Sequence, residues 1–230
     1  MDHQTLFFLL IGVAIVGLMI WQYYRNAQRR KALQAWAQAN GMQYDRTRDG
    51  SLDGRYSSFQ CLHRGSRRYG YNHLMGEWNE RPFHGFDYHY ETYSTDSKGR
   101  RQTHHHHFSA VVLESEIPLQ SLTIRPEGFL DRLGEIVGLD DIDFESAEFS
   151  KAFYVKAPDQ RWAFDVLHQR TMEFLLEAPR FTLEFDGQYV IAFRDSRFSP
   201  EDYAAAAAVI CGILDRLPDY LVQQQTGGTS

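Results

Sequence analysis

Residues 6–24 are the part of this chain that most restricts how it can fold. In these 19 residues the only strongly polar side chain is that of Gln22. At about 1.5 Å per residue, a helix of this length reaches about 28 Å, which is close to the thickness of the hydrocarbon core of a bilayer. The run therefore predicts one membrane-spanning helix near the N-terminus.

The residues on either side of this run predict its orientation. Trp21, Tyr23 and Tyr24 lie at its end, where aromatic rings prefer the level of the lipid headgroups. A basic cluster follows at once, and its members are Arg25, Arg29, Arg30 and Lys31. The first five residues contain Asp2 and no Lys or Arg. Because basic flanks stay in the cytoplasm, we expect the N-terminus outside and everything after the run inside.

Two alternative explanations of the apolar run agree less well with its flanks. A cleaved signal peptide would carry a basic region before the run and a small-x-small cleavage site after it, and neither is present. A buried core helix is rarely apolar on every face over this length and then followed by an Arg/Lys cluster.

The helix is predicted to continue beyond the membrane as a stalk. Leu33, Trp36 and Ala37 share one helical face, and Asn40-Gly41 is typical of a left-handed helix end. We therefore expect four regions: residues 1–24 for the external tip and membrane helix, 25–41 for the stalk, 42–222 for a cytoplasmic α+β domain that divides into lobes of about 42–138 and 139–222, and 223–230 for a disordered tail.

Alternating apolar and polar residues predict a domain rich in antiparallel strands with helices packed on the sheet. The Asp186-Gly187 pair is typical of a tight type I′ hairpin turn, and the polar segment 95–102 reads as the tip of a longer hairpin. The expected strands are residues 57–63, 67–75, 81–94, 103–115, 151–157 and the two arms of 181–193. The expected helices are residues 127–137, 161–178 and 200–217.

Several short motifs resemble those of a family of bacterial single-pass membrane proteins with a cytoplasmic α+β domain and no assigned activity. Their residues are Gly65, Asn72 and Gly76, then Phe86-Asp87-Tyr88-His89-Tyr90, and further on Asp141-Ile142-Asp143-Phe144 with Phe149-Ser150. Gly and Asn at such places are what tight strand connections require. The resemblance implies an anchor in the cell (inner) membrane, and it implies no catalytic residue and no cofactor.

Histidines are concentrated in one segment, and this is the compositional feature that could indicate a metal site. Eight of the ten lie between His63 and His107. On a strand, His104 and His106 share one face, and His89 and Glu91 could lie opposite them in the hairpin of residues 84–107. Imidazole and carboxylate ligands suit zinc or a similar divalent metal. A polar strand face near a hairpin tip explains the same residues, and we favour this explanation, with the side chains turned toward solvent.

Composition and missing motifs limit the remaining possibilities. The net charge of −6 argues against nucleic acid as a partner, because phosphate binding needs a basic face. Cys61 and Cys211 fall in a predicted strand and a predicted buried helix, so free thiols in a reducing compartment fit better than a disulfide. The common nucleotide-binding, hydrolase and zinc-protease motifs are not found in the sequence.

The sequence therefore favours a membrane-anchored module for protein interaction or scaffolding over an enzyme. Its expected partners are the lipid bilayer and an unidentified membrane or cytoplasmic protein, and no cofactor is expected. A metal-binding or metal-sensing domain that uses the histidine hairpin is the main alternative. An enzyme whose site is assembled from scattered residues is the third.

Overall fold

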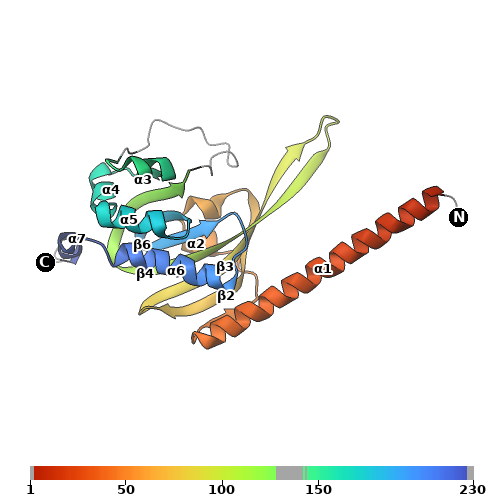
Figure 1. The fold of residues 1–230 in the computed structure, drawn as a ribbon, viewed down its shortest axis with the longest axis horizontal. Helices are drawn as coiled ribbons and strands as arrows, with labels where there is room; N and C mark the ends of the chain where they lie inside the picture. Colours follow the sequence, from red (N-terminus) through yellow and green to blue (C-terminus); the bar gives the residue numbers. More distant parts are fainter. Residues whose placement is uncertain (1–2, 128–141, 143, 227–230) are drawn as a thin grey trace.

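Helix α1 (His3–Ala39) is one continuous helix that leaves the rest of the molecule at its N-terminal end (Figure 1). The computed structural model describes residues 3–127, 142 and 144–226. Within them, α1 contains a stretch that is long and apolar enough to cross a membrane. Its last turns pack on the domain, where Leu33 and Ala37 are fully buried. Gly41 then ends the helix with a left-handed φ of +67°. The predicted stalk is thus a direct continuation of the apolar helix.

Six antiparallel strands form one sheet, and the expected α+β class is confirmed. The long strand β4 is its centre: β3 pairs along the first half of one edge, β5 pairs at the far end of that strand, and β6 runs along the other edge. Strands β1 and β2 extend the sheet beyond β3. The strands are β1 (Gln43–Asp45), β2 (Ser66–Trp78), β3 (Arg81–Thr95), β4 (Arg101–Pro126), β5 (Phe153–Lys156) and β6 (Thr182–Arg194).

Helices cover both faces of the sheet and enclose two apolar cores. The larger core lies under α1 and α6 and includes Leu33, Leu113 and Ile210. The smaller lies on the opposite face, under α2 and the 3-10 helix η1, and includes Phe59 and Phe108. The helices after α1 are α2 (Leu52–Arg55), η1 (Gln60–His63), α3 (Ala147–Ala152), α4 (Gln160–Val166), α5 (Gln169–Glu177), α6 (Pro200–Leu214) and α7 (Asp219–Thr226).

The N-terminus of α6 shows how closely local sequence and structure agree. The Ser199 hydroxyl accepts a hydrogen bond from the amide of Asp202, and the Asp202 carboxylate accepts one from the amide of Ser199. Pro200 occupies the first helical turn, where no amide hydrogen is needed. This capping box confirms the helix start expected at residue 200.

Two expected elements differ from the structure. Residues 57–63 are no strand, because Phe59, Cys61 and Leu62 all turn onto the smaller core through η1. The expected helix 161–178 is interrupted at Leu167 and His168, and forms α4 and α5. The expected helix 127–137 lies almost entirely outside the described residues.

The Asp186-Gly187 hairpin is also wrong, since β6 runs straight through this pair. Gly187 does take the left-handed φ that a tight turn requires, at +57°. It lies opposite Leu119, however, between two shifts in the β4–β6 register. The positive φ therefore serves a bulge in a long strand pair instead of a chain reversal.

Candidate functional site

The hairpin of β3 and β4 carries most of the histidines, and its register decides which of them can meet. His89 pairs with His107, Tyr90 with His106, and Glu91 with His105. Since side chains alternate between faces, His89, Glu91, His105 and His107 share one face of the hairpin, and His104 and His106 point to the other. The hairpin was expected, but the expected grouping of His104 and His106 with His89 and Glu91 is wrong. The register is shifted by one residue, so that His104 and His106 lie on the opposite face.

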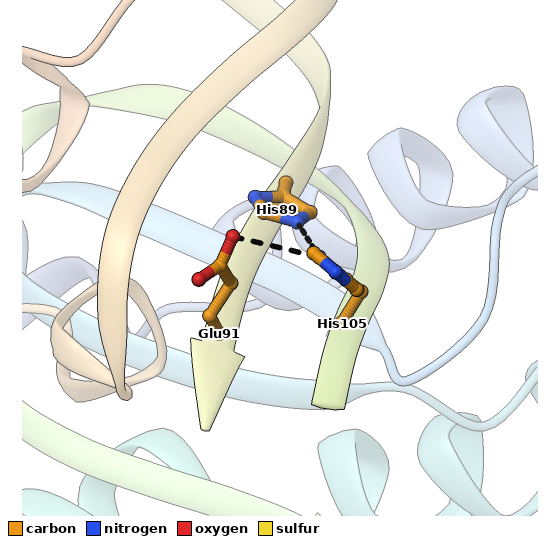
Figure 2. A group of neighbouring side chains, drawn as sticks. All are labelled: His89, Glu91 and His105. Carbon is orange, nitrogen blue, oxygen red and sulfur yellow. Dashed lines mark hydrogen bonds and ion pairs between the residues drawn. The ribbon is translucent and has the colours of Figure 1, made fainter. Parts of the chain in front are cut away.

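His89, Glu91 and His105 converge on the shared face (Figure 2). His89 Nε2 lies 3.1 Å from His105 Nδ1, and His105 Nδ1 lies 3.5 Å from Glu91 Oε1. All three potential ligand atoms are within 4.8 Å of one another. Two ligands of a tetrahedral zinc ion at its usual bond lengths are about 3.3 Å apart, so this His-Glu-His cluster is close to the spacing that such an ion requires.

The surroundings of the cluster prepare His89 to act as a ligand. Its Nδ1 lies 3.3 Å from the carbonyl oxygen of Arg67, which can only accept, so Nδ1 carries the hydrogen and Nε2 keeps its lone pair. Burial lowers the pKa of His89, which favours this neutral form. A histidine that binds a metal through one ring nitrogen usually donates the hydrogen of its other ring nitrogen to an acceptor such as a backbone carbonyl.

Glu91 and His105 differ in exposure. Glu91 is only 5 % exposed, against the expectation that these side chains turn to solvent, and it accepts a hydrogen bond from Tyr93 Oη at 3.0 Å. Nη1 of Arg67 lies 3.7 Å from Oε2 of Glu91. His105 is exposed and forms the open side of the cluster.

His104 and His106 have separate partners on the opposite face. His106 Nε2 lies 2.7 Å from Thr92 Oγ1, and its ring stacks on Tyr90. His104 Nε2 lies 2.7 Å from Ser94 Oγ. They are cross-strand pairs of an ordinary ladder, and no carboxylate of the described residues joins them in a ligand group.

His84 belongs to a buried chain of rings on the smaller core. Tyr56 Oη lies 2.9 Å from His84 Nδ1, and His84 Nε2 lies 3.0 Å from His73 Nδ1. Burial raises the pKa of Tyr56 to about 12, so the phenol donates to Nδ1. The His84 Nε2 hydrogen then goes to His73. Burial also lowers the pKa of His84 to about 3 and keeps the ring neutral.

Asp87 holds α1 in the domain. Its carboxylate is fully buried and accepts two hydrogen bonds from the Arg29 guanidinium, both at 2.7 Å. Asn72, which takes a φ of +53°, donates to it at 2.8 Å. Ser109 and Tyr203 donate to it as well. One carboxylate thus connects α1, β2, β4 and α6, and the sequence signal for it was an acidic residue inside an aromatic strand.

A pocket of about 280 Å³ opens beside this interaction, and it was not expected from the sequence. It lies between α1, β2 and the loop after β1, and we call it the basic pocket. Its lining residues are Asn26, Arg29, Arg30, Arg46, Arg48, Tyr69, Tyr71, Asn72, His107 and Arg197. The arginines come from three separate parts of the chain, so only the fold brings them together.

Comparisons with known proteins show a shared fold. A scan against protein-family models and a search of curated proteins find no match. Among solved structures, the chain is similar to the crystal structure of the mycobacterial trehalose monomycolate transport factor A, TtfA, with a TM-score of 0.58 and 12 % sequence identity. The match covers 83 % of this chain and 96 % of that one.

Proposed function

We propose that this chain is a membrane-anchored module of the cytoplasmic face that binds a protein partner and holds it close to the bilayer. The observation that carries the proposal is the connection between the anchor and the domain. Arg29 and Leu33 lie on the same helix as the apolar run, and both are fixed in the folded part. A domain on a flexible tether could take any orientation relative to the membrane. This domain has a fixed orientation relative to its anchor helix.

The shared fold agrees with an accessory role. The solved structure with this fold is named as a transport factor. We propose a comparable position for the present chain, beside a membrane protein complex and without a reaction of its own. The exposed surface of the folded part would supply the contacts for such a partner.

The test is cross-linking of the tagged full-length protein in native membranes, followed by quantitative purification. We expect one protein to be recovered in a fixed ratio to the chain. A matched control replaces residues 6–20 by an unrelated leucine-alanine span of equal length. It should recover the same partner, because the folded part makes the contact. Absence of any protein in fixed ratio from both versions would contradict the interaction function.

A second function is favoured by the His-Glu-His cluster, which could bind a divalent metal such as zinc. The donor set, the spacing of the three atoms and the carbonyl behind His89 all fit such an ion. Three protein ligands leave a fourth position open to water or to a partner's side chain. The domain would then sense metal or use it to bind its partner.

The two faces of the hairpin provide a matched test of metal binding. Untagged full-length protein is exposed to one equivalent of zinc and dialysed, and its zinc content is then measured. We expect the metal to be retained by the wild type and by His104→Gln and His106→Gln. It should be lost from His105→Gln and Glu91→Gln. Equal zinc contents in all five proteins would reject the cluster as the site.

A further inference from the structure

The basic pocket has an excess of positive charge with no acidic residue to balance it. Five arginines line it, and no Asp or Glu of the described residues does. Arg29 is neutralised by Asp87 behind the pocket wall. Neither Arg30 nor Arg46 has a carboxylate partner in the described part of the chain. Such a group of guanidinium ions repels itself unless an anion binds among them.

Neighbouring side chains hold two of the other arginines in place without cancelling their charge. The Arg48 guanidinium lies over the ring of Tyr69, 4.6 Å from its centroid. Arg197 donates a hydrogen bond to Asn26 Oδ1 at 3.1 Å. Both contacts orient a planar, bidentate donor, and this is the geometry that recognises phosphate oxygens.

His107 adds a neutral donor to the same wall. Burial, helped by the charge of Arg197, lowers the pKa of His107 to about 4. Burial raises the pKa of Tyr71 to about 12, so the Tyr71 hydroxyl donates to His107 Nδ1 across 3.1 Å. The hydrogen of the neutral ring is therefore on Nε2.

The position of the pocket along α1 indicates where such an anion comes from. Arg29 follows Tyr24 by five residues, or about 7.5 Å of helix. The headgroup layer on each side of a bilayer is about 5–8 Å thick. With the apolar run in the hydrocarbon core, the pocket lies at the level of the lipid phosphates. The β3–β4 hairpin, with Lys98, Arg100 and Arg101 at its tip, extends from the same side of the domain as the apolar half of α1 (Figure 1).

We propose that the basic pocket binds a phosphate group, and that an anionic phospholipid headgroup of the adjacent leaflet presents it. This inference rests on the membrane anchoring stated in the proposed function. The bound headgroup adds a second attachment to the bilayer next to the helix and fixes the rotation of the domain about α1. Arg30, Arg46, Arg48 and Arg197 bind the phosphate, and Asn26 and Tyr71 border it.

The test uses full-length protein in nanodiscs of phosphatidylcholine with increasing phosphatidylglycerol, and lipid binding is followed by native mass spectrometry. The double variant Arg46→Gln with Arg48→Gln should bind phosphatidylglycerol about thirtyfold more weakly, at about 1 kcal/mol for each arginine. Arg161→Gln with Arg170→Gln removes the same charge from an exposed part of α4 and α5, and should bind like the wild type. Equal weakening in both double variants would overturn the pocket as the site.

Two further arms separate the source of the phosphate and the role of the anchor. Inorganic phosphate is titrated in phosphatidylcholine nanodiscs, and we expect no saturable binding. Binding that the pocket variant abolishes would keep the phosphate chemistry but overturn the lipid as its source. Carbonate extraction of native membranes tests the anchor alone. Release of wild-type and variant chains alike would reject the anchoring, whereas equal lipid affinity with the anchor intact would reject only the pocket.

Discussion

Asp87 is a fully buried carboxylate whose charge is matched by a guanidinium and three neutral donors. An ion pair removed from water stabilises a fold only when every lone pair and every hydrogen is used, and this one meets that condition on the carboxylate side. Its partner Arg29 belongs to the helix that contains the apolar run. The two residues therefore help to hold α1 on the domain.

Replacement of Asp87 by Asn should destabilise the domain by about 3 kcal/mol, because it leaves the Arg29 charge partly buried and without its partner. The measurement is urea unfolding of the full-length protein in detergent. Asp186→Asn, at the bulge of β6, is the matched control and should stay within about 0.5 kcal/mol of the wild type. A wild-type unfolding midpoint for Asp87→Asn would show that the ion pair contributes nothing.

Stability should also decrease in mild acid, because one buried and one half-buried histidine resist protonation. Unfolded histidine binds a proton below about pH 6.5, whereas His84 and His107 stay neutral in the fold down to about pH 3 and about pH 4. Between these limits the unfolded state holds more protons, so the free energy of unfolding falls as the pH falls. His84 alone contributes a loss of about 2 kcal/mol at pH 5.

Unfolding midpoints at pH 7.5 and pH 5 measure this effect. His84→Gln should lose less stability between the two pH values than the wild type. His104→Gln removes an exposed histidine and should keep the wild-type difference. Identical pH dependence in all three proteins would show that His84 is not the titrating group.

At the scale of elements, patterns that depend on neighbouring residues predicted most of the fold. The Ser199-Pro200 helix start, the left-handed end at Gly41 and the β3–β4 hairpin each need only a few adjacent residues, and all three are confirmed. The η1 turn and the straight course of β6 past Gly187 depend instead on what the chain packs against. No local pattern contains that information.

The candidate sites show the same division. The concentration of histidines was visible in the sequence, but the register of the two strands was not. The cluster therefore contains His105, and not the expected His104 and His106. The arginines of the basic pocket are far apart in the sequence, from Arg29 near the start of the chain to Arg197 near its end. Only the assembled sheet and α1 bring them to one place.

The stalk half of α1 should behave as part of the domain. A protein of residues 28–230 keeps Arg29, Leu33 and Ala37, whereas one of residues 42–230 loses all three and exposes Trp78, which stacks on Trp36. Burial of one such side chain is worth about 1.5–3 kcal/mol. We expect the longer protein to be soluble and to unfold cooperatively, and the shorter one to melt at a clearly lower temperature. Equal melting temperatures would mean that the stalk does not dock.

At the scale of the whole molecule, the proposed topology places the folded part in the cytoplasm. A reporter that is active only in the cytoplasm should be active when it is fused after Ser230. The reason is that the basic residues that follow the apolar run stay inside. Fusion of the same reporter before Met1 is the control and should report the outside. Periplasmic activity of the C-terminal fusion would reverse the orientation and remove the cytoplasmic partner from the proposal.

The docking of α1 also affects the order of membrane insertion and folding during synthesis. Arg29 leaves the ribosome early, but its partners Asp87 and Phe198 follow 58 and 169 residues later. Contacts between such distant parts of a chain form late in folding. The apolar run is therefore available for membrane insertion long before the surface that receives the stalk has been synthesised. With the proposed anchoring, the domain would complete its fold around a helix that is already in the bilayer, and we expect each copy to be assembled at the membrane.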